Sequence, residues 1–390
     1  MTKNVYKFIN IEEIVDFTRR MICTPSVSGE EKEIANLVVD EMRQLGYDEV
    51  FVDKKYNAVG IIKGSGLGPK LMLNGHLDHA EVGKMKDPYS ARIMDGESFG
   101  VSGKVIYGRG ACDMKGGIAA MIYAAAAVKK AHLKPKGDII VAANSLEEVS
   151  QAEGINYIFE EDGINADMVI NGEATNLNVH LGHRGMMEVK VTVNGRSCHA
   201  SNPVRGINAI YKAGDFMKLL QDKYHLPEDN FFGNCTVTPI DINASPGRLS
   251  PIVPDQCVIF FDRRFLPSES PEKIENKFQQ LIKIAQREII DFNATVEITK
   301  IFPALFCSQE EPVVQALLKA RERVLGEKAK LSTWIFGIDG AFIAKRGIPC
   351  AGFGPGNELF AHTPEDHIPI EHLEKATKVY AEAIIEICVK

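Results

Sequence analysis

The sequence predicts an α/β protein that is interrupted by a second, smaller α+β domain. Helical and strand-like patterns alternate along the first half of the chain and again near its end, which is typical of a largely parallel sheet flanked by helices. Between these parts the pattern has antiparallel character. At 390 residues the chain is also too long for one average domain. We therefore expect one discontinuous domain, residues 1–181 and 294–390, and an inserted domain, residues 182–293.

The first part of the chain contains both patterns. Apolar residues at helical spacing predict helices over Ile11–Ile22 and Glu30–Leu45, and the second helix ends at Gly46. An alanine-rich stretch predicts a helix over Gly117–Ala131. Short apolar runs predict strands at Ala58–Ile62, Leu71–Leu73, Ile139–Ala142 and Met168–Ile170.

The inserted block and the last part of the chain differ in rhythm. In the block we expect strands and helices in the order Met187–Val193 (strand), Asn208–Gln221 (helix), Cys235–Ile240 (strand), Cys257–Arg264 (strand) and Ser270–Ile290 (helix). The α/β alternation then returns with strands at Trp334–Phe336 and Ala351–Phe353 and a closing helix over Ile370–Val389.

Composition narrows the class of protein. Lysine and arginine number 45 against 52 acidic residues, and the net charge of −7 argues against nucleic-acid binding. No apolar run approaches the roughly 20 residues of a membrane span, and the first residues lack the apolar region of a secretory signal. Eight dispersed cysteines without a Cys-x-x-Cys pair fit a reducing compartment, so we expect a cytoplasmic protein.

Residues that can bind metal follow several of the predicted strands, and another lies near the end of the chain. They are His76, Asp113, the pair Glu147-Glu148, Glu173 and His362. Each has a plainer explanation by itself: a loop histidine, a helix N-cap or a solvated pair of glutamates. Most of them, however, stand in glycine-punctuated turns, and the carboxyl ends of strands form the ligand crevice of open α/β sheets. We therefore expect them to meet.

Two imidazoles and three carboxylates suit a pair of divalent cations, and mixed nitrogen and oxygen ligands favour zinc. The charges also balance, because two Zn²⁺ ions offset three carboxylates and one hydroxide. In an extended segment His76 and Asp78 share one face, so the Asp78 carboxylate could accept the ring N–H of His76 and fix its tautomer.

These segments resemble a known family, that of di-zinc acetylornithine deacetylase, succinyl-diaminopimelate desuccinylase, aminoacylase and glutamate carboxypeptidase. The motifs that carry the resemblance are Asn74–Asp78 (NGHLD), Gly108–Gly117 (GRGACDMKGG), Glu147-Glu148, Gly172-Glu173 and Ala361–Pro364 (AHTP). The resemblance implies a zinc-peptidase-like catalytic domain, whose mixed sheet is flanked by helices, and an inserted α+β lid or dimerisation domain.

The resemblance also implies the metal ligands. Asp113 would bridge two zinc ions per subunit, with Co²⁺ or Mn²⁺ as substitutes. His76 and Glu173 would complete one site, and Glu148 and His362 the other.

It further implies a general base, Glu147, and an orienting role for Asp78 toward the neighbouring histidine ligand. Relatives hold a cis peptide after the bridging aspartate, so we expect Asp113–Met114 to be cis. The segment around His199 resembles the one whose histidine stabilises the oxyanion, in many members from the partner subunit. We therefore expect a homodimer formed through the lid.

Two arginines resemble the family's carboxylate-binding positions. They are Arg184 and Arg264, although a surface arginine beside an acid is the alternative for each. Strand alternation places Asp262 and Arg264 on one face and Arg263 on the other, where we expect tolerance to substitution.

Two further features concern the substrate directly. Gly354 and Gly356 resemble a loop that approaches the substrate, with a plain turn as the equal alternative. Pro251 stands where many relatives have asparagine, which puts one substrate contact of those relatives in doubt here.

The expected function is metal-dependent hydrolysis of the amide bond of an N-acyl amino acid, deacetylase- or desuccinylase-like, with Glu147 as base. A di- or tripeptidase or a carboxypeptidase on the same scaffold is the alternative, and a non-catalytic metal or peptide binder is a remote one. Glutamate rather than aspartate at 173 favours the deacylase and carboxypeptidase members. The partner would be a small carboxylate-bearing substrate, with no nucleic acid and no membrane.

Overall fold

The computed structural model describes residues 2–149, 152–247 and 251–390. The chain divides into two compact units. The first unit comprises Met1–Gly182, Phe306–Trp334 and Ile338–Lys390, and the second comprises His183–Leu305 and Ile335–Gly337. The predicted α/β class with an inserted α+β part is confirmed.

The second boundary of the inserted part was predicted wrongly. We expected it at residue 293, but the second unit continues to Leu305. The reason is strand β12 (Asn293–Phe302), which pairs antiparallel with β9 (Gly185–Asn194) and so belongs to the second unit's sheet. Polar residues interrupt the apolar ones along this strand, so no apolar run marked it.

A mixed sheet forms the centre of the first unit. Its order is β1-β2-β6-β3-β7-β15-β8-β13, with β14 also pairing with β8. Strand β3 runs parallel to both of its neighbours, β6 and β7, and β15 is parallel to β7. The strands are β1 (Glu49–Val52), β2 (Ala58–Ile62), β3 (Leu71–His76), β6 (Ile139–Asn144), β7 (Met168–Asn171), β8 (Val179–His183), β13 (Leu305–Phe306), β14 (Leu331–Trp334) and β15 (Cys350–Gly352). A small separate sheet has the order β16-β5-β4, from β16 (His367–Pro369), β5 (Lys104–Tyr107) and β4 (Arg92–Asp95).

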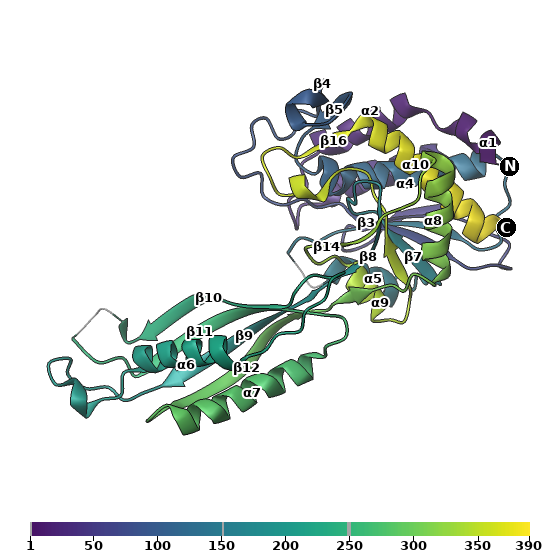
Figure 1. Ribbon diagram of the computed structural model, residues 1–390. Coiled ribbons are helices and arrows are strands. Elements are labelled where there is room, and N and C mark those ends of the chain that lie inside the picture. The colour runs from purple at the N-terminus through teal and green to yellow at the C-terminus, as the bar shows by residue number, and fades with distance from the viewer. Residues whose placement is uncertain (1, 150–151, 248–250) are drawn as a thin grey trace. The chain divides into compact units, whose positions relative to one another are not determined.

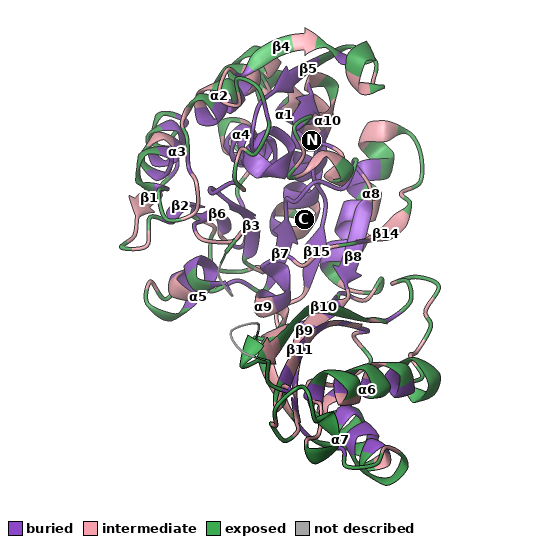
Figure 2. Cartoon of the chain, turned by 90° about the vertical axis from the view of Figure 1, so that its left-hand side faces the viewer, coloured by how far each residue is buried: buried purple, intermediate pink, exposed green. Residues whose placement is uncertain are grey.

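Helices cover this sheet, and two of them, α4 (Gly116–Lys130) and α10 (Ile370–Ile384), pack side by side against its core (Figure 1). The others are α1 (Thr2–Val5), α2 (Ile11–Cys23), α3 (Lys32–Gln44), α5 (Glu153–Glu160), α8 (Pro312–Leu325) and α9 (Gly340–Ala344). The first turn of α2 is capped by the Asn10 side chain, which accepts a hydrogen bond from the Glu12 amide. The central strands and α4 are buried (Figure 2).

Helix α4 corrects one expectation from composition. Among the described residues, Ala111–Lys130 is long and apolar enough to span a membrane by length and composition alone, whereas we expected no such stretch. All of its most apolar window is buried within the protein. Its apolar character is therefore explained by its position in the core of the first unit.

The second unit is a four-stranded antiparallel sheet of order β10-β11-β9-β12 with two helices. Residues of β9 alternate between buried and half-buried, so one face packs against α6 (Ala209–Lys223) and α7 (Pro271–Glu288). The remaining strands are β10 (Thr236–Ser245) and β11 (Gln256–Phe265). Strand β10 lies at the sheet edge and is mostly exposed, including Ile240 and Ile242, and the outer faces of α6 and α7 are exposed as well (Figure 2).

Candidate metal centre

The candidate ligands stand at the carboxyl ends of three neighbouring parallel strands. His76 is the last residue of β3. Glu147 and Glu148 lie in the turn after β6, and Glu173 follows β7 by two residues. Because these strand ends meet at one edge of the sheet, the side chains converge there.

Asp113 lies between the two histidines. The His76 Nε2 atom is 3.0 Å from Asp113 Oδ1 and 2.9 Å from Glu173 Oε1. The His362 Nε2 atom is 3.2 Å from Asp113 Oδ2 and 2.9 Å from Glu148 Oε2. Donor atoms of His76, Asp113 and Glu148 lie within 4.8 Å of one another. The structure thus brings all five predicted ligands to one point, with one Asp113 oxygen facing each histidine.

The donor set fits divalent cations. Three carboxylates share this small, largely buried volume, and Glu173 Oε2 is buried without a hydrogen-bond partner within the described residues. A buried carboxylate oxygen without a partner is unfavourable unless a cation or a donor compensates it. Carboxylate and imidazole ligands in this proportion suit zinc or a similar transition metal. His76, Asp113 and Glu173 would hold one ion, and Asp113, Glu148 and His362 the other.

The carboxylates favour protonation of both imidazoles wherever no cation is bound. Hydrogen bonds to Asp113 and Glu148 raise the pKa of His362 to about 10. Burial opposes the charge on His76, but Glu173 and Asp113 hold its pKa well above the usual range. Burial would likewise raise the pKa of Asp113, yet its hydrogen bonds to both histidines lower it. A bound metal must therefore displace protons from both rings.

Asp78 contacts His76 and also holds a neighbouring turn. The ring N–H at His76 Nδ1 donates to the Asp78 backbone carbonyl at 2.9 Å, and the Asp78 carboxylate forms an ion pair with the same ring at 3.6 Å. The carboxylate further accepts from the amides of Glu147 and Glu148, both at 3.1 Å, and from the Ser28 hydroxyl at 2.7 Å. Asp78 therefore fixes the turn that carries the candidate base and one ligand.

The loop that carries Asp113 is held by a residue that sequence reasoning missed. The Asp366 carboxylate accepts from the Gly110 amide at 2.6 Å and the Cys112 amide at 3.0 Å, and it lies 3.3 Å from an Arg109 nitrogen. Asp366 is fully buried and stands four residues after His362, so one segment supplies both a ligand and this anchor. As expected, the Asp113–Met114 peptide bond is cis.

Glu147 lies beside the ligands. Burial raises the pKa of its carboxyl group well above the usual range, and the carboxylates of Asp339, Glu173 and Glu148 add to this effect although His76 opposes it. Asp339 was also missed by sequence reasoning. It is buried just before α9, and its Oδ2 atom accepts from the Asn144 side chain at 2.8 Å.

The loop with Gly354 and Gly356 packs against the ligand segments. A Cβ atom on Gly354 would lie 2.2 Å from the Glu173 carbonyl oxygen, and one on Gly356 would lie 2.7 Å from Cys112 Cβ. Gly356 also has a φ of +90°. Close packing therefore explains both glycines, and their contact with substrate stays a prediction.

The remaining predicted residues belong to the second unit. His199 is exposed, and its Nδ1 atom accepts from the Ser201 amide at 3.1 Å. Arg184 donates to the Asn234 carbonyl. Two nitrogens of the Arg264 guanidinium, Nε and Nη2, donate to the two carboxylate oxygens of Asp262 at 2.8 and 3.0 Å. This pairing confirms that the two side chains share a strand face.

The expectation that Arg263 tolerates substitution is wrong. It is fully buried and binds both oxygens of Glu269, at 2.8 and 3.1 Å. Its strand face is the one that packs under the helices of the second unit, so strand alternation directs this side chain into the core. Removing it would leave the partly buried Glu269 carboxylate with only the more distant Lys277 ammonium, at 3.9 Å, as a charged partner.

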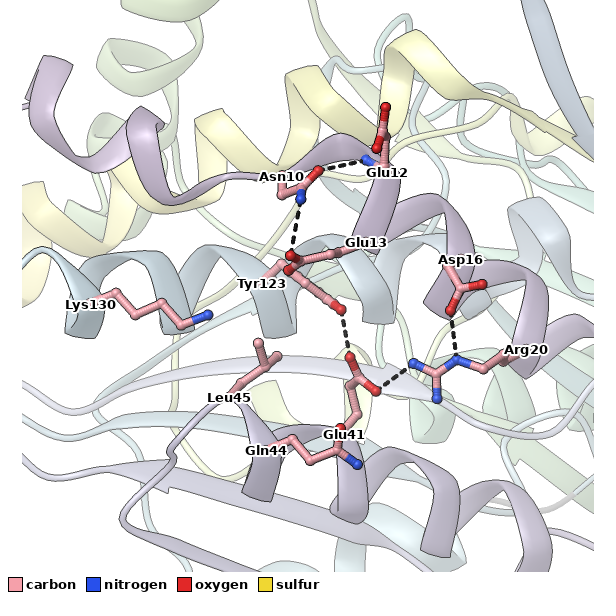
Figure 3. Close-up of a pocket in the computed structure, with 10 residues that line it drawn as sticks. All are labelled: Asn10, Glu12, Glu13, Asp16, Arg20, Glu41, Gln44, Leu45, Tyr123 and Lys130. Carbon is pink, nitrogen blue, oxygen red and sulfur yellow. Dashed lines mark hydrogen bonds and ion pairs between the residues drawn. The ribbon is translucent and has the colours of Figure 1, made fainter.

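A separate hollow on the first unit lies between α2, α3 and α4 (Figure 3). Its polar side chains pair with one another. Tyr123 donates to Glu41 at 2.5 Å, Glu41 binds Arg20 at 2.5 Å, and Arg20 also binds Asp16 at 2.9 Å. None of the predicted site residues lines it.

Comparison with known proteins identifies the family. The model of "Peptidase family M20/M25/M40" matches residues 72–386, which is most of the chain and includes all five candidate ligands. The chain belongs to this family. The resemblance that the motifs predicted is thereby confirmed, and the protein is a metallohydrolase of the M20/M25/M40 class.

Individual relatives of this M20/M25/M40 member cover nearly its whole length. The uncharacterized protein YgeY of Escherichia coli (strain K12) is 32% identical over 406 residues, covering 98% of each chain. Succinyl-diaminopimelate desuccinylase of Corynebacterium glutamicum is 26% identical and covers 95% of each chain. The crystal structure of the Bacillus subtilis YXEP protein, described as a dinuclear metal binding peptidase, superposes with a TM-score of 0.75 at 17% identity, over 97% of this chain and 98% of that one. The last similarity shows the fold.

Proposed function

We propose that the protein hydrolyses the amide bond of a small N-acyl amino acid and holds two zinc ions per subunit, with Co²⁺ or Mn²⁺ as substitutes. The observation that carries the proposal is the position of Asp113, with one carboxylate oxygen facing each of His76 and His362. Glu173 and Glu148 complete two ligand sets around it. The dinuclear metal binding of the YXEP protein agrees with this arrangement.

Glu147 would act as the general base. Bound divalent cations supply Lewis acidity toward the amide oxygen and lower the pKa of water. Glu147 would take the proton of the attacking water and hand it to the leaving nitrogen. Asp78 holds the Glu147 amide at 3.1 Å, so the base starts from a fixed backbone position.

His199 would stabilise the oxyanion of the tetrahedral intermediate. A backbone N–H can only donate, so the bond from the Ser201 amide makes Nδ1 of a neutral His199 the acceptor and leaves the ring proton on Nε2. The Nε2–H group then faces away from this contact as a donor.

We further propose that this donor comes from the partner subunit of a homodimer. The exposed edge strand β10, with Ile240 and Ile242, supports a lid-to-lid interface, because an exposed long edge strand offers unpaired backbone groups and apolar surface to a second chain.

The substrate is proposed to carry a carboxylate. Arg264 and Arg184 would bind it, since the planar fork of arginine matches a carboxylate. Asp262 already holds two nitrogens of Arg264 and so fixes the direction of the guanidinium group. The desuccinylase relative from Corynebacterium glutamicum acts on an N-acyl compound, as its name states, and favours a deacylase. A di- or tripeptidase or a carboxypeptidase is the alternative, and the YXEP peptidase has the same fold.

We propose a cytoplasmic location, which the eight free cysteines support. The composition also supports a protein that acts on small molecules without nucleic acid or membrane partners.

One assay tests the substrate class. The purified protein, loaded with Zn²⁺, Co²⁺ or Mn²⁺, is incubated with N-acetyl, N-succinyl and N-carbamoyl amino acids beside a panel of dipeptides and tripeptides. We expect metal-dependent release of free amino acid from at least one N-acyl substrate, with kcat/KM above that for every peptide. Higher kcat/KM for the peptides would favour the alternative, and no turnover of any amide with any metal would contradict the proposal.

A further inference from the structure

Three buried asparagine side chains form a hydrogen-bonded ladder under the candidate metal centre. Asn171 and Asn144 are the last residues of β7 and β6, and Asn74 lies two residues before the end of β3. The Asn171 Nδ2 atom donates to Asn74 Oδ1 at 3.0 Å, and Asn74 Nδ2 donates to Asn144 Oδ1 at 2.8 Å. The Asn144 Nδ2 atom donates to Asp339 Oδ2 at 2.8 Å. The ladder therefore crosses three strands and ends on a buried carboxylate.

The direction of this ladder is fixed by groups that can act in only one way. The Glu173 backbone N–H donates to Asn171 Oδ1 at 3.0 Å, so the oxygen of that amide must face it. The Ala142 carbonyl accepts from Asn74 Nδ2 at 3.2 Å, so the nitrogen of that amide must face the next strand. Because the Asn144 oxygen accepts from Asn74, the Asn144 nitrogen must point toward residue 339. Residue 339 must therefore supply an acceptor.

Each amide of the ladder directly precedes a segment that supplies the metal centre. His76 is two residues after Asn74, and Glu173 is two residues after Asn171. The turn with Glu147 and Glu148 begins shortly after Asn144. Asn171 touches its ligand directly, because it accepts the Glu173 backbone N–H, so a rotation of this amide would remove that bond from the ligand's backbone.

We propose that Asp339 is a positioning residue of the metal centre, which anchors the Asn144 end of the ladder and, through Asn74 and Asn171, supports the backbone of the ligand Glu173. This inference rests on the proposed two-metal function. A hydrocarbon at 339 would leave the Asn144 nitrogen only the Ser145 carbonyl, at the longer distance of 3.4 Å, as an acceptor, and the amides could then rotate. The ladder needs only one acceptor oxygen at this place, so asparagine at 339 should preserve it.

The test measures Zn²⁺ affinity rather than turnover. Metal-free wild type, Asp339→Ala and Asp339→Asn are titrated with Zn²⁺ against a competing chelator, and the folded fraction is checked by thermal unfolding. Partners of metal ligands typically change affinity by about 10- to 100-fold when removed. We expect Asp339→Ala to bind one of the two ions about 10- to 100-fold more weakly, and Asp339→Asn to bind both ions nearly as the wild type does.

Glu41→Ala is the matched control. It removes another buried carboxylate of the first unit, one that accepts from Tyr123 and Arg20 in the separate hollow (Figure 3). It should lower the unfolding temperature without changing either Zn²⁺ affinity. If Asp339→Ala does not fold, Asn171→Ala breaks the ladder at its other end. We then expect this variant to bind one of the two Zn²⁺ ions about 10- to 100-fold more weakly. Where both fold, the double variant should bind Zn²⁺ no more weakly than the weaker single variant.

Wild-type affinity in a folded Asp339→Ala protein would overturn the inference. An equal loss of affinity in Glu41→Ala would also overturn it, because the effect would then follow from general destabilisation. Failure of the wild type to bind two Zn²⁺ ions would instead contradict the proposed function itself.

Discussion

Replacing Arg264 by alanine should weaken hydrolysis of an anionic substrate while leaving the second unit folded. The side chain of Arg264 is 34% exposed and pairs with Asp262, and half-exposed ion pairs contribute only about 0–1 kcal/mol to stability. A charge-assisted hydrogen bond to a substrate carboxylate contributes about 1.5–3 kcal/mol. Since 1.4 kcal/mol corresponds to a factor of ten, kcat/KM for the free acid should fall about 10- to 150-fold.

The adjacent Arg263 provides the contrasting variant. It is fully buried against Glu269, and removing one partner of a buried pair costs about 3–5 kcal/mol. Arg263→Ala should therefore lower the unfolding temperature strongly, whereas Arg264→Ala should leave it nearly unchanged. The two neighbouring arginines thus separate an effect on the unfolding temperature from an effect on the recognition of a negatively charged substrate.

The assay compares kcat/KM for an N-acyl amino acid and for its neutral amide. Arg264→Ala should penalise the acid about 10- to 150-fold and the amide far less. Arg264→Lys should restore part of the loss, because an ammonium group lacks the planar fork. An equal penalty for acid and amide would refute the reasoning, since the arginine would then act on the fold and not on the substrate carboxylate.

Three further predictions concern the metals and the assembly. Asp113→Ala should lose both metal ions, and metal analysis that finds one site fully occupied would contradict the bridging role. At pH 7 the metal-free protein keeps His76 and His362 protonated, because both pKa values are raised, the second to about 10. Zn²⁺ binding should therefore release at least two protons, and affinity should rise with pH; calorimetry in buffers of different ionisation enthalpy that shows no proton release would contradict this. Glu147→Ala and His199→Ala subunits, each nearly inactive, should regain activity when mixed, and no recovery despite subunit exchange would place His199 outside the neighbour's site.

Much of the candidate centre was predictable because its ligands are tied to local sequence. His76 ends β3 and Glu173 follows β7 by two residues, and parallel strands present their carboxyl ends at one edge whatever the rest of the fold does. The fold class was predictable for a similar reason, since alternating helices and strands leave few arrangements.

The supporting residues were not predictable in the same way. Asp366 binds amides about 255 residues earlier in the chain, and Asp339 meets Asn144 across a separation of 195 residues. Such partners depend on tertiary packing that no local pattern records. One signal was nevertheless visible, because an asparagine directly follows the apolar residues of three strands, in LMLN, IIVAAN and MVIN.

Two errors have similarly specific causes. Polar residues interrupt the apolar pattern of the ten-residue strand β12, so the sequence did not predict this strand and placed the end of the inserted domain too early. Alternation assigned Arg263 to the correct strand face, but which face was covered by helices could be learned only from the assembled unit.

The central claim is that Glu147 acts as the base beside a centre whose metals are held by other residues. Glu147→Gln, loaded with Zn²⁺, tests it most directly when metal content and turnover are measured on the same preparation. We predict two Zn²⁺ ions per subunit, as in the wild type, with kcat lower by several orders of magnitude. Loss of a metal ion together with the loss of turnover would show that Glu147 is a metal ligand. Turnover near the wild-type rate would show that Glu147 is not the general base.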